Sequence, residues 1–342
     1  MNIIVDAMGG DNAPDAIVLG AISAAAELGI EVTLVGRSEE ILRATMRKDI
    51  MELPDGIKIV DASEVIEISD DPATAIRTKK DSSLSVGLAL LRDGRGDALV
   101  SAGSTGALLS GATLIVKRIR GIRRAALAPV IPSLSGSFIL IDCGANAECT
   151  PEYLLQFAYM GAFYAEDVLG VKSPRIGLLN NGTENTKGTS LQLETFQLLK
   201  DTELNFLGNV EAKDAMKGVC DVLVCDGFTG NIFLKTIEGT ASLIMSELKA
   251  VFMSGALTKL AALLIKKKMS GLKEKLNPDS TGGTALLGIS KPVIKAHGSS
   301  GAGAISNAIA RAAKEVRSNI AVRFRENIGS MKISIDRTGQ ES

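Results

Sequence analysis

Short, almost wholly apolar segments recur along this chain, and most of them end at a polar residue followed by glycine or another small residue. Apolar runs of this kind are typical of strands that are buried on both faces of a sheet. They predict strands over residues 2–5, 31–35, 57–61, 98–101, 138–141, 175–179, 219–225 and 293–296.

Longer segments with apolar residues at helical spacing separate most of these strands. They predict helices over residues 14–27, 37–51, 82–92, 107–116 and 151–168, and further helices that end near residues 199 and 324. Alternating strands and helices are typical of a layered α/β protein. We therefore expect a Rossmann-like αβα fold with a largely parallel sheet, built as one catalytic domain over residues 1–342.

The loops after six of the predicted strands are rich in Gly, Ser, Thr, Asn and Asp. They begin at Asp6, Ser101, Asp142, Asn180, Asp226 and His297. In open parallel sheets, ligands bind outside the carboxyl ends of the strands. We therefore expect these loops to share one edge of the sheet and to form one compact polar pocket.

The loop Gly103-Ser104-Thr105-Gly106 joins the predicted strand 98–101 to the predicted helix 107–116. Its glycines let the backbone approach a ligand closely, and its hydroxyl residues can cap the helix. The N–H groups at a helix start attract anions, phosphate above all. An ordinary strand-to-helix turn has the same local features, but similar loops at five other strand ends favour a phosphate site.

The alternation of strands and helices stops between residues 238 and 277, where we expect an inserted, protruding helical arm. Two helices fit the pattern, 240–252 and 257–276, with Ser254 and Gly255 between them. One face of the second helix carries Leu257, Leu260, Ala261, Leu264, Ile265, Leu272 and Leu276, and the rest carries Lys259, Lys266, Lys267, Lys268, Lys273 and Lys275. Such a helix fits either a core or dimer interface, or an anionic membrane surface.

Composition and charge exclude several classes of protein. Of the 342 residues, 46% are hydrophobic, and the formal net charge of -1 gives no support for nucleic acid as a partner. The four cysteines have no CxxC spacing and predict reduced thiols of a cytosolic protein. No signal-peptide pattern is present at the N-terminus, and glycines interrupt the uncharged segment 98–116, which argues against a membrane-spanning helix there.

The polar loops lack the motifs of several common catalytic sites. The chain has no GxSxG elbow, no HExxH motif, no Walker A motif and only one histidine, and GAGAIS at residues 301–306 is an incomplete dinucleotide fingerprint. A reaction in which phosphate itself attacks a thioester suits these loops better. Phosphate needs little help from a base, and a departing thiol needs little protonation. The protein would mainly position the reactants and stabilise negative charge.

Several motifs resemble those of the phosphate acyltransferases called PlsX. They are VDAMGGD at residues 5–11, VSAGSTGAL at 100–108, Ala-Pro at 128–129, DGFTGN at 226–231 and KAHGSS at 295–300. The resemblance extends over nearly the whole chain. It implies transfer of a long-chain fatty acyl group from acyl carrier protein to inorganic phosphate, which yields acyl phosphate for phospholipid synthesis. It also implies a homodimer with a fold similar to isocitrate and isopropylmalate dehydrogenases. Small departures are Cys143, where the family usually has an aliphatic residue, and Thr189, where asparagine is frequent.

For that reaction, Lys187, Asn231 and His297 are the expected catalytic residues. Lys187 would hold phosphate or the developing oxyanion, unless it is an ordinary solvated lysine. Asn231 would direct its amide at the thioester carbonyl, unless it caps a helix. His297 would either donate to phosphate or hold a neighbouring loop. The expected phosphate-binding and thioester-binding residues are Gly103, Ser104, Thr105, Gly106, Asn146, Glu184, Asp226 and Gly230, and no metal or cofactor is expected.

Three other functions remain open: phosphate acetyl- or butyryltransfer from acyl-CoA, NAD-dependent β-decarboxylating dehydrogenation, and a non-catalytic membrane scaffold. The expected partners are acyl carrier protein, a second copy of the chain, an anionic membrane surface contacted through residues 240–276, and a membrane acyltransferase that uses acyl phosphate. The acidic carrier is expected to dock on Arg118, Arg120, Arg123 and Arg124 or on lysines near the arm. The expected location is the cytoplasm, in peripheral contact with the inner face of the cell membrane.

Overall fold

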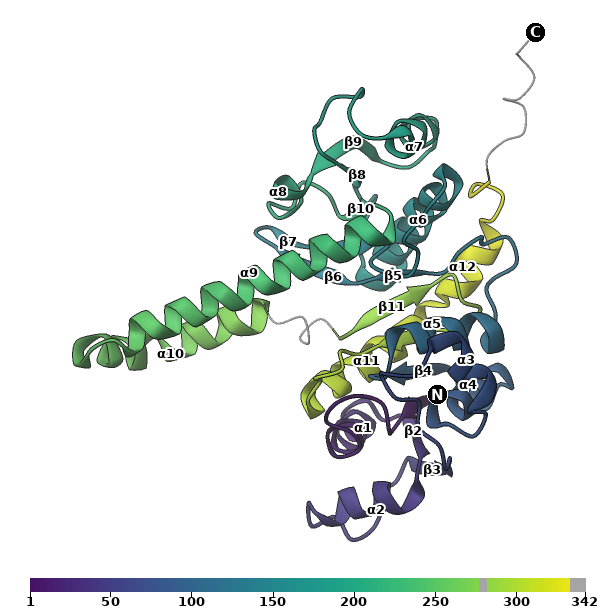
Figure 1. Cartoon of the computed structure of the whole chain (residues 1–342), viewed down its shortest axis with the longest axis vertical. Helices are drawn as coiled ribbons and strands as arrows, with labels where there is room; N and C mark the ends of the chain where they lie inside the picture. Colours follow the sequence, from purple (N-terminus) through teal and green to yellow (C-terminus); the bar gives the residue numbers. More distant parts are fainter. Residues whose placement is uncertain (277–281, 333–342) are drawn as a thin grey trace.

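An α/β body carries two long helices that project from it (Figure 1). The computed structural model describes residues 1–276 and 282–332, without the side chains of residues 272–276. The arm side chains expected at Leu272, Lys273, Lys275 and Leu276 therefore lie outside the described residues. The expected α/β class with mostly parallel strands is confirmed.

Among the described strands, seven form the larger sheet, in the order β3-β2-β1-β4-β12-β11-β5. Their bounds are β1 (Asn2–Asp6), β2 (Glu31–Gly36), β3 (Ile57–Asp61), β4 (Ala98–Ser101), β5 (Ala126–Ala128), β11 (Thr284–Leu287) and β12 (Val293–Lys295). Neighbours pair in parallel except at β11, which is antiparallel to β12 and β5. The central strands β1 and β4 are buried because helices cover both faces of the sheet.

A smaller sheet of five described strands has the order β6-β7-β10-β8-β9. Its strands are β6 (Val130–Ser133), β7 (Gly136–Ile141), β8 (Ile176–Asn180), β9 (Phe206–Glu211) and β10 (Val222–Val224). Only the β6–β7 pair in this sheet is antiparallel.

These two sheets correct the expectation of one sheet with a single ligand-binding edge. The loops after β1, β4 and β12 belong to the larger sheet, and the loops after β7, β8 and β10 belong to the smaller one. The chain passes between the sheets at Pro129, which separates β5 from β6. Proline has no N–H to donate to a strand ladder, so a continuous strand is interrupted at this position.

Helices connect the strands and cover the faces of both sheets (Figure 1). In the body they are α1 (Asp15–Leu28), α2 (Ser38–Met46), α3 (Pro72–Thr78), α4 (Ser83–Arg92), α5 (Thr105–Gly111), α6 (Pro151–Tyr164), α7 (Ser190–Lys200), α8 (Ala212–Ala215), α11 (Ala302–Ser318) and α12 (Ile320–Glu326). Helices α1 and α11 pack closely at Gly20, where an added Cβ would lie 2.5 Å from the carbonyl oxygen of Ala302.

Polar side chains and one left-handed residue determine several helix ends. The side chains of Asp71 and Ser82 accept backbone N–H groups at the starts of α3 and α4. Asn319 has a φ of 53°, which ends α11 and divides the single helix expected to reach residue 324.

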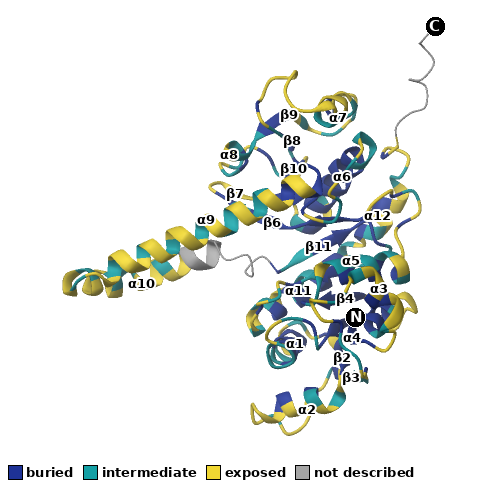
Figure 2. Ribbon diagram, in the orientation of Figure 1, coloured by how far each residue is buried: buried dark blue, intermediate teal, exposed yellow. Residues whose placement is uncertain are grey.

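Helices α9 (Gly227–Met253) and α10 (Ala256–Leu276) form the projecting arm. The first begins at Gly227 rather than at residue 240, because the Asp226 carboxylate accepts the N–H of Thr229 at 2.8 Å and caps the helix. α10 packs along α9, and its outer side exposes Leu257, Leu260, Leu263 and Leu264 (Figure 2). Among the described residues, no helix is both long and apolar enough to cross a membrane.

The fully buried carboxyl group of Asp142 connects the two sheets. It accepts the N–H of Leu127 in β5 at 2.8 Å, and it also accepts backbone N–H groups of Cys143, Ala145 and Asn146 in the loop after β7. Burial raises the pKa of this carboxyl above its ordinary value, while these hydrogen bonds act in the opposite direction. A single side chain therefore holds a strand of the larger sheet against a loop of the smaller one.

Replacing this carboxylate should destabilise the body. Asp142→Ala leaves several buried N–H groups without an acceptor, and each costs about 1–3 kcal/mol. We expect the free energy of unfolding to fall by at least about 3 kcal/mol, measured by urea denaturation. Asp55→Ala removes an exposed aspartate and serves as the matched control. Equal unfolding midpoints for the two variants would contradict the role assigned to Asp142.

Candidate functional site

A cavity of about 360 Å³, which we call the central cavity, lies where the two sheets meet the base of α9. Its polar or glycine residues are Thr105, Gly144, Asn231, Lys235, Glu238, Gly283, Thr284, Lys295 and His297, and Lys235 forms an ion pair with Glu238 at 2.7 Å. Apolar residues form most of the remaining wall: Leu127, Pro129, Val130, Ile131, Met216, Leu234, Ile237 and Ala241. The wall follows α9 from Asn231 to Ala241, which is about 15 Å of helix by its rise per residue. The cavity thus combines a small polar group with a long apolar surface.

Asn231 lies in the second turn of α9 and faces Gly144. A Cβ added to Gly144 would lie 3.7 Å from the amide carbon of Asn231, which is ordinary van der Waals contact, but Gly144 has a φ of 112°, and this backbone conformation disfavours any larger residue. Because Asp226 caps α9, Asn231 is not the cap. Its side-chain amide can therefore interact with a ligand in the cavity.

His297 holds the loop after β12 and also lines the central cavity. Its Nδ1 accepts the backbone N–H of Ser299 at 3.3 Å and lies 2.8 Å from the Ser299 hydroxyl, which fixes the loop after β12. Since a backbone N–H can only donate, the neutral ring carries its proton on Nε2. The ring lines the central cavity, where an Nε2–H group is suited to donate to an anion.

Lys295, at the end of β12, lines the cavity. It belongs to the motif at residues 295–300 but was not among the expected site residues. Its Nζ lies 3.3 Å from the carbonyl oxygen of Ala102 and also contacts that of Ala296. Burial lowers the pKa of this amine to about 8, although Asp6 and Asp11 act to raise it. The sequence signal that could have identified it is a lysine within an otherwise apolar strand, between Ile294 and Ala296.

Two buried polar side chains, Ser101 and Asp6, hold the start of the Gly103–Gly106 loop. The Ser101 hydroxyl donates to Asp6 at 2.6 Å and accepts the N–H of Gly103 at 3.1 Å. The Ser104 hydroxyl oxygen lies 3.4 Å from the N–H of Ala107 as the cap of α5, and Thr105 lines the cavity. Of the four loop residues, the structure therefore places Thr105 at the cavity wall.

Lys187 and Glu184, both expected at the site, lie outside the central cavity. Both are exposed residues of the loop between β8 and α7, and neither lines the central cavity. Their backbone groups hold that loop together, since Asn180 donates to the carbonyl of Lys187 and Asn209 to that of Glu184. The reason is topological, because β8 belongs to the smaller sheet and is separated from β7 by β10.

Asn146, Asp226 and Gly230 lie next to the cavity but have structural contacts. The Asn146 amide donates to the carbonyl of Ala125 and to Asp142, and Asp226 caps α9. An added Cβ at Gly230 would lie 2.0 Å from the carbonyl oxygen of Asp142, so only glycine fits there. These residues position Asn231 and Gly144.

Cys143 also lines the cavity, but it is a poor nucleophile. Burial raises the pKa of its thiol to about 12, so the reactive thiolate is scarce near neutral pH. Since Lys235 is paired with Glu238, the groups suited to chemistry are the Lys295 amine, an amide, an imidazole and a threonine hydroxyl beside an apolar surface. They can bind an anion and polarise a carbonyl group.

Comparison with known proteins agrees with these features. The sequence model of the family described as "Fatty acid synthesis protein" matches residues 1–323. A phosphate acyltransferase of Geobacillus thermodenitrificans is 47% identical over 340 residues, which cover 99% of this chain and 100% of that protein. A phosphate acyltransferase of Bacillus licheniformis is 48% identical over 330 residues, covering 96% and 98%.

Solved structures with low sequence identity share the fold. A phosphotransacetylase from Streptococcus pyogenes superimposes with a TM-score of 0.63 at 18% identity, covering 93% of this chain and 94% of that one. A branched-chain phosphotransacylase from Enterococcus faecalis V583 gives a TM-score of 0.56 at 16% identity, covering 92% and 99%. The match of the family model and the near full-length identity to curated relatives establish that this chain belongs to the phosphate acyltransferase (PlsX) family of acyltransferase enzymes.

Proposed function

We propose that this enzyme transfers a long-chain fatty acyl group from acyl carrier protein to inorganic phosphate and so forms acyl phosphate for phospholipid synthesis. The relatives' name, phosphate acyltransferase, supports acyl transfer to phosphate. The observation that carries the proposal is the central cavity, in which Asn231, Lys295 and His297 adjoin an apolar wall along α9. A polar reaction centre beside such a wall fits an acyl chain much longer than acetyl.

In the proposed reaction, Lys295, Thr105 and the Nε2–H of His297 hold phosphate. An oxygen of the phosphate dianion attacks the thioester carbon, and the Asn231 amide stabilises the oxyanion that forms. The C–S bond then breaks, the thiolate leaves with the electron pair and takes a proton from water, and the acyl–oxygen bond remains in the product. The chain need not supply a general base, because phosphate is already substantially ionised near neutral pH.

The same features weigh against the two alternative activities. A short acyl group from acyl-CoA would leave most of the apolar wall unoccupied. A β-decarboxylating dehydrogenase needs grouped acids for a divalent metal. In residues 1–276 and 282–332, no three His, Cys, Asp or Glu side chains are grouped in a way that could hold one.

The proposed carrier protein is acidic and would dock on local basic surface, which speeds and orients the encounter. Two such surfaces are candidates. One carries Arg118, Arg120, Arg123 and Arg124, and the other carries the exposed arm lysines Lys259, Lys266, Lys267 and Lys268. A homodimer in the cytoplasm, and a membrane acyltransferase that receives the acyl phosphate, complete the proposal.

The reaction itself is the first test. Long-chain acyl carrier protein and phosphate should yield acyl phosphate and free thiol carrier, followed by mass spectrometry and thiol release. Asn231→Ala should lower kcat/KM by about 100-fold, the usual effect of losing an oxyanion donor. Acetyl-CoA as the better donor, or oxidation of a substrate with NAD, would replace the proposal with one of the alternatives.

Three lysine variants test which cation serves phosphate. Lys295→Ala should raise the KM for phosphate, and Lys172→Ala, at an exposed lysine outside the cavity, should not. Lys187→Ala belongs in the same series. A larger loss in Lys187→Ala than in Lys295→Ala would show that the loop after β8 closes over the cavity during the reaction.

The pH dependence of kcat/KM for phosphate should report the state of Lys295. The amine is charged below its pKa of about 8 and neutral above it, so phosphate binding should weaken as the pH rises through about 8. Lys295→Arg keeps its charge far above this range. Its lower activity should therefore show no falling limb near pH 8, and an unchanged limb in this variant would assign it to another group.

We further propose that the arm binds an anionic membrane surface through residues 240–276. Leu257, Leu260, Leu263 and Leu264 of α10 are 57–84% exposed, and lysines follow them at residues 266–268. Exposed apolar side chains next to lysines are typical of helices that lie in the lipid interface. Ile265, expected on the same apolar face, is half-buried instead.

Vesicle flotation tests this arm. Leu260→Glu combined with Leu264→Glu should weaken binding to anionic vesicles more than about 100-fold, because burial of each leucine contributes about 1.5–3 kcal/mol. Ser242→Glu combined with Ser270→Glu adds the same charge at exposed arm positions and keeps the leucines. Equal flotation of both double variants would mean that α10 instead covers a protein surface, such as a second copy.

A further inference from the structure

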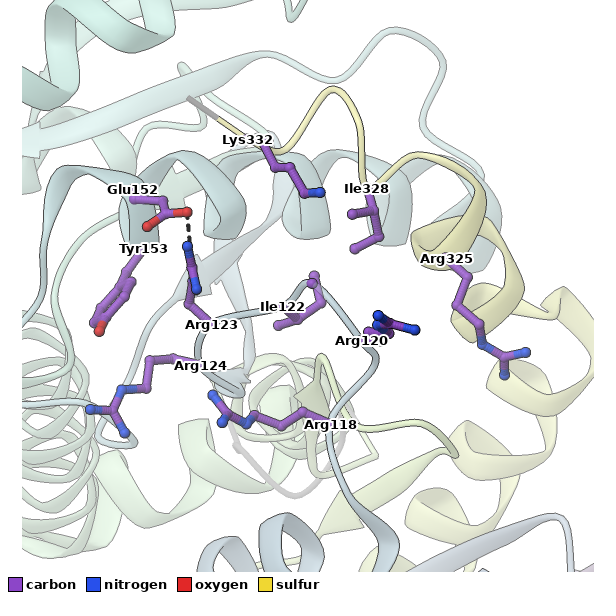
Figure 3. A pocket seen from close by; sticks show the side chains of 11 residues that line it. Arg118, Arg120, Ile122, Arg123, Arg124, Glu152, Tyr153, Arg325, Ile328 and Lys332 are labelled. Atoms are coloured by element: carbon purple, nitrogen blue, oxygen red, sulfur yellow. Dashed lines mark hydrogen bonds and ion pairs between the residues drawn. The ribbon is translucent and has the colours of Figure 1, made fainter. Parts of the chain in front are cut away.

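A second concave site lies on the body of the protein and shares no lining residue with the central cavity. We call it the basic pocket, and it is defined by Arg118, Arg120, Arg123, Arg124, Arg325 and Lys332 (Figure 3). Its volume is about 900 Å³. Three segments build it: the loop before β5, the first turn of α6, and the end of α12 with the residues that follow. A site of this size is in the range of small-molecule pockets.

A buried glutamine fixes the backbone beneath these cations. Gln156 is fully buried in α6, and its Oε1 accepts the N–H of Arg123 at 2.8 Å. Its Nε2 donates to the carbonyls of Gly121 at 3.0 Å and Met331 at 3.3 Å. One amide thus ties the arginine loop to the segment after α12, so the arrangement of the backbone is set before any ligand arrives.

Positive charge in the basic pocket is far in excess of negative charge. Six cationic side chains line it, against the single carboxylate of Glu152, which pairs with Arg123 at 3.0 Å. Arg124 lies over the ring of Tyr153, a contact that does not neutralise its charge. Within the described residues, the structure shows no ion pair for Arg118, Arg120 or Lys332. Like charges gathered in a concave site repel one another and focus a field that attracts anions.

The lining also indicates what kind of anion fits. One phosphate group leaves most of an excess of five positive charges uncompensated, whereas a chain of phosphates compensates most of it, and guanidinium groups match phosphate oxygens with paired hydrogen bonds. Ile122, Ile328 and the Tyr153 ring add apolar and aromatic surface to the same pocket. That surface suits a planar organic group attached to the phosphates.

We propose that the basic pocket is a binding site for a nucleoside polyphosphate. The phosphate chain lies against Arg118, Arg120 and Arg325, and the base and sugar lie against Ile122, Ile328 and Tyr153. The proposal is independent of acyl transfer, because it concerns a separate pocket and a ligand that does not react. Occupation of the pocket also removes Arg118 and Arg120 from any docking surface for an acidic protein.

Isothermal titration calorimetry of the full chain with ATP, in the absence of divalent cations, tests the proposal. Arg118→Gln combined with Arg120→Gln should raise the Kd for ATP more than tenfold. Arg95→Gln combined with Arg317→Gln, at exposed arginines outside the pocket, should change it less than twofold. Equal Kd values in the two double variants, or the lack of saturable ATP binding, would overturn the proposal.

Tripolyphosphate distinguishes the nucleoside from its phosphates. ATP should bind more tightly than tripolyphosphate, and Tyr153→Ala should weaken ATP binding while leaving tripolyphosphate binding unchanged. Equal affinities of the wild-type protein for both probes would overturn the nucleoside assignment. Binding of orthophosphate with the same Kd as tripolyphosphate would overturn the polyphosphate assignment as well.

Discussion

The carboxylate of Asp142 is the contact on which the remaining structure of the central cavity depends. It accepts N–H groups from β5 of the larger sheet and from the loop after β7 of the smaller sheet, and it receives the side-chain amide of Asn146 as well. Such a buried acceptor is tolerated because its hydrogen bonds offset the loss of water. The same loop lies against Gly227 and Gly230, where only glycine fits, and so sets the position of the first turns of α9 and of Asn231.

The cavity lies at the junction of the sheets, and this location explains its mixed lining. Strands β5 and β6 supply apolar residues on either side of Pro129, while the start of α5, the second turn of α9 and the end of β12 with the loop after it supply polar groups. Positive charge gathers at two separate sites of the molecule. The central cavity has the partly buried Lys295 with a lowered pKa and the ion-paired Lys235, whereas the basic pocket has many exposed arginines around Glu152. The net charge of -1 therefore hides two different anion-attracting sites.

The strand ends and most helices followed from apolar periodicity, but several short strands did not. β5 and β11 have only three and four residues, which is too short for a period that would distinguish them from loops. The division into two sheets was also hidden, because pairing between distant strands leaves no local pattern. The motif at residues 295–300 pointed to His297, yet Lys295 in the same motif reaches the cavity too, while Lys187 in a more conspicuous polar loop does not line it.

The sequence by itself determined the α/β class, the positions of the polar loops and the resemblance to a family, because each of these depends on residue types at short spacing. Tertiary structure alone decided which loops meet. Asn231, Lys295 and Thr105 come from separate segments, and their proximity depends on the order of the strands and on the Asp142 contact between the sheets. The same holds for the basic pocket, where the arginines at residues 118–124 are adjacent in sequence but Arg325 and Lys332 reach them only through the packing of α12 near α6 and the buried amide of Gln156.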